Sequence, residues 1–269
     1  MKNFAIVCLA EMQKQIKNYY NSWTNFISLL LWPVLIYFTT YYGYSSFDIT
    51  NLKKYGICSE YELLIFLIIG MLGYNSFFSM VQGAFQIQKE RENGTIEIIY
   101  LTPANRLALL YGRAMGGFFQ STWLFLTFFI AILFYVQNVT MKKIVMFISS
   151  YVVLFIASVV WGGLMNVLFM TSRDSSFLFS ICDEPMNFFS GVKIPVNAFP
   201  ILGRVIASVF PLYYCLKAMR AMMLTFNPIV VVNNLGKLIM SIVIIVIITN
   251  IISYFSEKRS RKTGNLQLF

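Results

Sequence analysis

Charged side chains are densest in one short segment, Lys89-Glu90-Arg91-Glu92-Asn93-Gly94-Thr95-Ile96-Glu97. Carboxylates beside guanidinium and ammonium groups form charge-assisted hydrogen bonds, either with each other or with a protein partner. The chemistry that these residue types offer is therefore recognition. One interpretation is a docking surface for a second protein. The other is an ordinary solvated loop whose charges keep it out of a membrane.

The sequence lacks the usual groups of catalysis. It has no histidine and only eleven acidic residues. It has no HExxH or GxSxG motif and no GxxxxGK[ST] loop for a nucleotide phosphate. The four cysteines are far apart and show no CxxC spacing, which argues against a metal site or a disulfide framework. We expect no catalytic residue, metal or cofactor, and no nucleotide-binding site, in this chain.

A second group of polar residues, Asp183, Glu184 and Asn187, lies within an apolar stretch. A carboxylate near the middle of a bilayer costs roughly 2.5–3.5 kcal/mol on insertion scales, so it normally faces a wet cavity or a partner. One interpretation is a cargo path that recognises a cationic group. The alternative is ion pairing at the membrane interface with basic residues further along, Lys193, Lys217 or Arg220.

Long apolar segments must position these groups. Of the 269 residues, 58% are hydrophobic and 12% charged, whereas soluble domains have roughly 25% charged residues. A helix needs about 20 apolar residues to cross a bilayer. Six segments reach or approach that length: 23–42, 62–85, 114–136, 144–170, 176–192 and 236–256. We predict an all-α polytopic membrane protein, one transmembrane domain over 1–269 with a six-span bundle over 22–256.

The two ends of the chain indicate how it sits in the membrane. Apolar residues recur at spacings of three and four over 1–21, with Lys14 and Lys17 on the other side, which predicts an interfacial helix. Six spans place both termini on one side, and the basic tail 257–269 favours the cytoplasm. Anionic lipid head groups, not nucleic acid, account for the net charge of +10. The abundance of Lys, Asn, Ile and Phe suggests an AT-rich bacterial genome, so we expect the bacterial cytoplasmic membrane.

The connection between the second and third spans predicts short surface helices. Asn93-Gly94 is a turn signal, and Thr95 can cap a helix over 96–100. Thr102 and Pro103 repeat the pattern, because Thr caps and Pro fits the first helical position. We expect a short helix on the membrane surface before the chain enters the third span.

The connection between the fifth and sixth spans is also unusual. Glycines and prolines separate two apolar pieces, 196–202 and 205–210, that are too short to cross a membrane. They predict a re-entrant or extracellular helical hairpin. A further short helix over 213–225 is expected before the sixth span.

These motifs resemble those of ABC type-2 transporter permeases. The charged segment, followed by Leu101-Thr102-Pro103 and Leu110-Tyr111-Gly112-Arg113, is similar to the family pattern E-R-E-x-G-T-x-E, L-x-x-P and L-x-G-K/R. A second match consists of Ser190-Gly191-Val192-Lys193-Ile194-Pro195, Ala198-Phe199-Pro200, Phe210-Pro211-Leu212-Tyr213-Tyr214 and Ala218-Met219-Arg220-Ala221. Lys193 and Tyr213 depart from the family pattern, so the outer hairpin can differ in detail. The resemblance covers nearly the whole chain.

The resemblance implies a membrane permease subunit of an exporter that alternates between inward-open and outward-open states. A separate ABC ATPase subunit would bind ATP and Mg, and a second permease subunit, identical or different, would complete a dimer. The surface helix would dock in the ATPase, with the interfacial helix as a second contact. The residues expected to couple the two proteins are Glu90, Arg91, Glu92, Gly94, Thr95, Glu97 and Pro103.

Two other classes of function stay open at this point. The chain could be a channel or secondary transporter that needs no ATP. Against this, the sequence shows no repeated half with matched broken helices, which secondary transporters often have. The chain could also be an immunity protein that sequesters a toxic peptide in the membrane without exporting it.

Overall fold

The computed structural model describes residues 2–20, 23–45, 53–55, 57–102, 104–135, 141–172, 175–225 and 228–263, and these ranges contain helices and no strand. The α-helices are α1 (Lys2–Tyr20), α2 (Trp23–Ser45), α3 (Glu60–Glu92), α4 (Thr95–Leu101), α5 (Arg106–Ala114), α6 (Phe118–Tyr135), α7 (Met141–Thr171), α8 (Ser175–Phe189), α9 (Ile201–Val209), α10 (Pro211–Arg220) and α11 (Pro228–Thr263). Shorter turns are η2 (Lys53–Tyr55), η3 (Met115–Gly117), η4 (Val196–Ala198) and the π-helical η5 (Ala221–Thr225). The predicted all-α class is confirmed.

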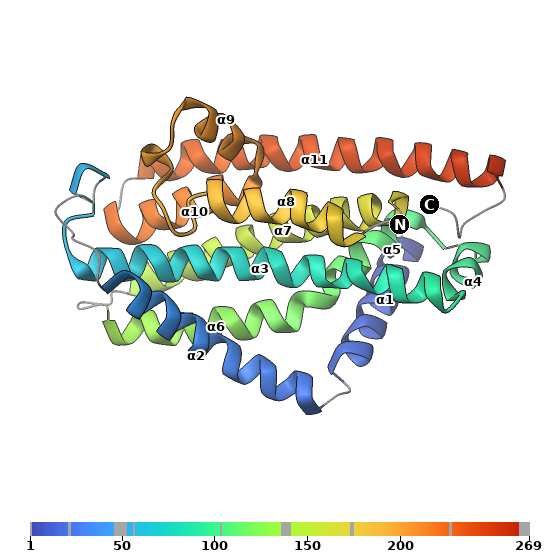
Figure 1. Cartoon of the computed structure of the whole chain (residues 1–269), viewed down its shortest axis with the longest axis horizontal. Coiled ribbons are helices and arrows are strands. Elements are labelled where there is room, and N and C mark those ends of the chain that lie inside the picture. Colours follow the sequence, from blue (N-terminus) through green and yellow to red (C-terminus); the bar gives the residue numbers. More distant parts are fainter. Residues whose placement is uncertain are drawn as a thin grey trace.

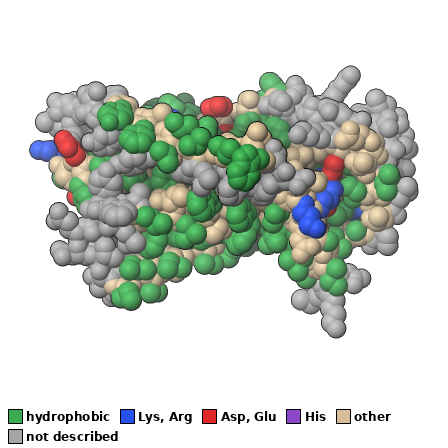
Figure 2. Space-filling model, turned by 90° about the horizontal axis from the view of Figure 1, so that it is seen from below, with side chains coloured by type: hydrophobic (Ala, Val, Ile, Leu, Met, Phe, Trp, Pro, Cys, Tyr) green, Lys and Arg blue, Asp and Glu red, His purple; other side chains and the backbone are tan. Residues whose placement is uncertain are grey.

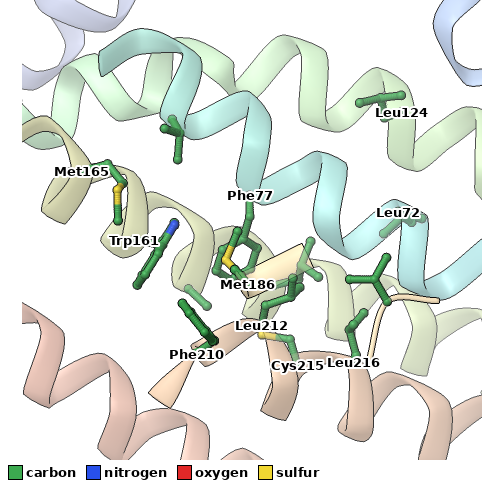
Figure 3. Close-up of a cluster of buried hydrophobic side chains, with 14 of the residues drawn as sticks. Leu72, Phe77, Leu124, Trp161, Met165, Met186, Phe210, Leu212, Cys215 and Leu216 are labelled. Carbon is green, nitrogen blue, oxygen red and sulfur yellow. The ribbon is translucent and has the colours of Figure 1, made fainter. Parts of the chain in front are cut away.

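Helices α3 and α7 form the centre of an elongated bundle, and α6, α10 and α11 pack around them (Figure 1). Their contact is apolar: Leu72 and Phe77 of α3 lie with Trp161 of α7 and Leu212 of α10 in one buried cluster (Figure 3). Trp161 also meets the ring of Phe210 edge to face, with 5.7 Å between the ring centroids. Burial of large aromatic and aliphatic side chains therefore joins α10 and the residue before it to the central helices.

Three helices among the described residues are long and apolar enough to cross a membrane: Glu60–Ile87 in α3, Phe147–Thr171 in α7 and Ile229–Ser256 in α11. A fourth span is formed if Ile201–Val209 and Pro211–Met223, bent by 97° to each other, are one broken segment. A helix lies at each of the six predicted positions. The six-span topology itself stays a prediction.

The bundle has two distinct ends. Helices α1, α4 and α5 and the C-terminal part of α11 lie at one end, and η2 lies at the other (Figure 1). Seen from below, the molecule presents a largely hydrophobic surface with few charged side chains (Figure 2). That surface suits contact with lipid or with another membrane-embedded chain. Which end faces the cytoplasm stays a prediction.

Several element boundaries differ from the prediction. Helix α3 continues through the charged segment to Glu92, because Gln, Lys, Glu and Arg are good helix formers. The predicted third span, 114–136, begins at the last residue of α5 and is divided into η3 and α6. The last helix is longer than the predicted 236–256, since it begins at Pro228 and continues through the basic residues to Thr263.

The connection between α8 and α11 forms a bent helical pair. Helix α9 exposes Ile201, Leu202 and Val205, whereas α10 buries Leu212 and Leu216 against the central helices. Pro211 occupies the first turn of α10, where its missing N–H would have no helical partner in any case. The predicted helix over 213–225 therefore begins two residues earlier and ends in the π turn. The predicted pieces 196–202 and 205–210 instead form η4 and the single helix α9, which continues through Gly203. Whether this hairpin is re-entrant or extracellular stays a prediction.

Candidate functional site

The surface helix α4 is held at a sharp reversal of the chain after α3. Its N-cap is Gly94, with φ of 67°, a left-handed conformation that glycine adopts without steric cost. Thr95 is the first helical residue, so the predicted role of Thr95 as the cap is wrong. Its hydroxyl instead donates to the carbonyl of Glu90 at 3.1 Å and bonds α4 back to α3. The chemistry of the turn, more than a polar cap, sets the direction of α4.

Helix α4 has one buried and one exposed apolar position. Ile96 is buried in the main core cluster, whereas Ile98 has 66% of its surface exposed. The helix ends at Thr102, whose hydroxyl donates to the carbonyl of Ile99 at 2.6 Å. The seven-residue helix is thus anchored on one side and presents an apolar side chain on the other.

The helix that follows begins later than predicted. Its N-cap is Asn105, whose side-chain oxygen accepts from the N–H of Ala108 at 3.3 Å. The predicted start at Thr102 and Pro103 is therefore wrong: Thr102 terminates α4, and Pro103 lies outside the described residues. Asn binds an N-terminal amide as well as Thr does, and the sequence offers both within four residues.

A buried ion-pair cluster joins α1, α3 and α5 behind this surface helix. Arg113 of α5 donates through Nη2 to Glu90 of α3 at 2.7 Å and through Nε to Glu11 of α1 at 3.2 Å. Lys14 of α1 donates to the other oxygen of Glu90. Gln15 donates to Glu11 at 2.8 Å. Two cations and two carboxylates thus neutralise each other at the joint of three helices.

The burial of this cluster determines what it contributes. Side chains of Arg113 and Glu11 are only 7% and 6% exposed, whereas that of Lys14 is 36% exposed. A paired charge in such a place adds little net stability, but loss of one partner leaves the other uncompensated. The cluster therefore specifies how α1, α3 and α5 fit together.

Close backbone contact brings α1 onto α5. A Cβ placed on Gly112 would lie 2.6 Å from the carbonyl oxygen of Cys8, closer than any real side chain can come. The Cys8 sulfur lies 3.5 Å from the sulfur of Met115. Burial raises the pKa of the Cys8 thiol, which keeps it neutral. Glycine at position 112 lets α1 reach the cluster.

The structure places the predicted coupling residues in different surroundings. Glu90 is buried in the ion-pair cluster, while Gly94 and Thr95 form the turn into α4. The side chains of Arg91, Glu92 and Glu97 lie outside the described part of the structure. Glu90 is thus turned toward its own chain, and the described apolar group on the outside of α4 is Ile98.

The two acidic side chains of α8 point to different surroundings, one buried and one exposed. Asp183 is buried and accepts a hydrogen bond from the hydroxyl of Tyr74 on α3 at 2.6 Å, whereas Glu184 is exposed. Neither the second oxygen of Asp183 nor the side-chain oxygen of Asn187 has a partner among the described residues. The hydroxyl of Tyr74, not a basic residue, is the partner of Asp183.

Arg220 is held by backbone carbonyls instead of a carboxylate. It donates to Gly191 at 2.7 Å, to Phe66 at 2.9 Å and to Val192 at 3.3 Å, and its guanidinium lies 3.4 Å from the ring centre of Phe66. Lys217 is exposed and donates to the hydroxyl of Tyr213 at 3.3 Å. The structure thus gives Asp183 and Arg220 separate partners, and the ion pair is not formed.

Sequence reasoning missed Glu11, Gln15 and Tyr74 as parts of these sites. Glu11 and Gln15 continue the helical spacing of the apolar residues Val7 and Cys8 on α1. Polar residues on an otherwise apolar helix face were the one available signal. Their partners lie far along the chain, 102 residues away between Glu11 and Arg113 and 109 between Tyr74 and Asp183.

Comparison with known proteins agrees with this arrangement of helices. A comparison with curated protein sequences gave no match. The model of one protein family, described as ABC-2 type transporter, matches residues 3–224. That range includes α1, the ion-pair cluster, α4 and the bent pair of α9 and α10. Because the match covers more than half of its length, this chain belongs to the ABC-2 type transporter family.

Proposed function

We propose that this chain is the membrane permease subunit of an ATP-driven exporter, and that α4 docks into a separate ATPase subunit. Family membership supports the permease role, and this family normally pairs with an ABC ATPase. The observation that carries the docking role is the geometry of α4. It is a short helix at one end of the bundle, fixed by Gly94 and Ile96, with Ile98 directed outward.

Force applied to α4 has a short route into the bundle. Thr95 bonds to the backbone of Glu90, and the side chain of Glu90 bonds to Arg113 and Lys14. Movement of α4 would therefore displace α3, α5 and α1 together. Rigid-body rocking of this kind is a common way to alternate access. To shift a two-state transporter from 1:99 to 99:1 takes about 5.5 kcal/mol of differential binding, which the partner would supply.

The proposed complex contains two permease subunits and two ATPase subunits in the bacterial cytoplasmic membrane, with both termini of this chain in the cytoplasm. ATP and Mg bind to the ATPase, which carries out the hydrolysis. The exposed apolar surfaces of α9 and α11 offer area for the second permease subunit and for lipid. Cargo would pass between the two subunits, from the cytoplasmic side to the outside.

The test is to isolate the tagged chain from its native membrane in mild detergent and to assay ATP hydrolysis. We expect an ATPase with a P-loop to co-purify. Ile98→Asp should lower the recovered ATPase activity at least tenfold, because a charge replaces an apolar contact, while Ile98→Leu should keep it. If the chain is recovered alone and moves a solute into vesicles without ATP, the channel or secondary-transporter alternative is correct.

The sequestration alternative requires a different experiment, in cells exposed to the toxic peptide. A chain that only sequesters the peptide protects the cell without any motor. We expect protection to be lost when the catalytic residues of the ATPase partner are mutated. Full protection by this chain with an inactive ATPase would contradict export.

A further inference from the structure

A small polar cavity opens where α1, α3, η3 and α6 meet, and the docking role of α4 leaves it unexplained. Its volume is about 20 Å³. Three glycines line it together with five polar side chains, Gln15, Ser79, Gln82, Gln86 and Gln120. Among the residues that the structure describes, no charged side chain lines it. Four primary amides around one cavity are a dense set of hydrogen-bond donors and acceptors.

The amides occur where apolar side chains are expected. Ser79, Gln82 and Gln86 follow each other at spacings of three and four on α3, within a segment apolar enough to cross a membrane. Gln15 and Gln120 are 4% and 9% exposed. Gln15 donates to Glu11 and is held in place by that hydrogen bond, and the amide atoms that face the cavity can bond to a polar occupant.

Because three of the lining residues are glycines, backbone atoms form part of the cavity wall. A Cβ on Gly116 would lie 2.5 Å from the Cβ of Gln15, and one on Gly117 would lie 2.2 Å from the carbonyl oxygen of Ser79. Side chains at these positions would push the helices apart. The close approach brings amides from three elements around a single small space.

The charges nearby favour an uncharged occupant. The adjacent ion-pair cluster contains two cations, Lys14 and Arg113, and two carboxylates, Glu11 and Glu90, which satisfy one another. A charged ligand would find no opposite charge on the lining. A hydroxyl or amide head group can both donate to and accept from glutamine side chains.

We propose that this cavity binds the uncharged hydroxyl or amide head group of an amphipathic molecule. Its volume of about 20 Å³ is far below the roughly 300–1,000 Å³ of pockets for drug-sized ligands, so it takes one small polar group and leaves the rest of the molecule outside. Apolar surface is available beside it, because Phe118 follows the lining residue Gly117 in the chain and is 41% exposed.

The cavity is linked to the ion-pair cluster through Gln15. Gln15 lines the cavity and donates to Glu11. Arg113 donates to both Glu11 and Glu90, and Glu90 lies near the end of α3, just before α4. The role of the cavity as a cargo site rests on the proposed export function. Binding there would affect the position of α4 through this chain of hydrogen bonds. Binding itself needs no ATPase and is tested separately.

The test measures binding of four probes with the same alkyl chain to the full-length chain, by native mass spectrometry in detergent. Lauramide and monolaurin carry amide and hydroxyl head groups, and laurate and dodecylammonium carry charges. We expect one or both neutral probes to bind at least tenfold more tightly than the charged ones. The better of the two neutral probes identifies the head-group chemistry.

The matched variants are Gln82→Leu with Gln86→Leu in the cavity, and Gln13→Leu on the exposed side of α1. The double variant should weaken the binding of the neutral probes at least tenfold, while Gln13→Leu should leave their binding unchanged. Leu keeps the side-chain size and suits an apolar helix, and Gln120→Leu provides the same test if the double variant does not fold. Equal binding of all four probes, or equal binding by cavity and control variants, would overturn the proposal. Neither result depends on whether an ATPase co-purifies.

Discussion

Single residues in this protein act mainly through partners that are distant in sequence. Arg113 is the clearest case, because its guanidinium contacts carboxylates from two other helices. The sequence indicated that position 113 belongs to a motif, but it did not indicate that its partner is Glu11, 102 residues earlier. Long-range pairing follows from how three helices meet, which side-chain types and spacing along one helix do not encode.

Arg113→Gln should lower the free energy of unfolding by about 3–5 kcal/mol, because it leaves Glu11 and Glu90 buried with fewer positive partners. Lys14→Gln removes the charge of a side chain that is 36% exposed, and it should lower the free energy of unfolding by less than about 1 kcal/mol. Unfolding in mixed micelles with increasing dodecyl sulfate measures both. Equal losses for the two variants would mean that the cluster does not act as described.

Arg220→Gln should loosen the bent pair of α9 and α10, because three backbone carbonyls lose their donor. Cys215 on α10 is 2% exposed, so its alkylation by N-ethylmaleimide reports that opening. We expect the rate at Cys215 to rise at least tenfold. Arg220→Lys should be intermediate, because one ammonium cannot replace a planar fork of donors.

Cys8 serves as the internal control in the same experiment, because it is buried at the opposite end of the bundle. Its alkylation rate should not change in Arg220→Gln. A parallel rise at Cys8 and Cys215 would indicate general unfolding. Unchanged reactivity at Cys215 would show that Arg220 does not hold the segment in place.

At the scale of elements, the sequence predicted the existence of helices better than their ends. Apolar length alone locates a helix at all six expected spans, since a segment of that composition must satisfy its backbone internally in lipid. The ends depend on competing local signals. Thr95 and Gly94 both suit the start of α4, and the left-handed turn at Gly94 prevails because it lets Ile96 reach the core.

Gly94→Val should weaken the coupling of α4 to the ATPase subunit without unfolding the bundle. A β-branched residue at a φ of 67° is strained by about 1–3 kcal/mol, and no neighbouring atom lies within 4 Å of the added Cβ to interfere otherwise. Gly94→Asn should keep most activity, because Asn tolerates the left-handed region. The measurement is ATP hydrolysis by the isolated complex. Loss of activity in both variants alike would contradict a purely conformational role.

The whole molecule places α4 and η2 at opposite ends of the bundle (Figure 1). If both termini are cytoplasmic, exposed Cys58 next to η2 faces the outside. A membrane-impermeant maleimide should therefore label Cys58 on intact cells. Gln13→Cys on the exposed side of α1 should be labelled only after permeabilisation. The reverse pattern would invert the topology and remove α4 from the cytoplasm.

Contact between α4 and a nucleotide-binding partner is the central claim at this scale, and site-specific photo-crosslinking tests it most directly. Benzoyl-phenylalanine is introduced in place of Ile98 on α4, and in a second chain in place of exposed Tyr55 at the other end of the bundle. After irradiation in the native membrane, we predict a crosslink to a P-loop ATPase from position 98 and none from position 55. Absence of that product from position 98, in a chain that still transports solute without ATP, would contradict the account.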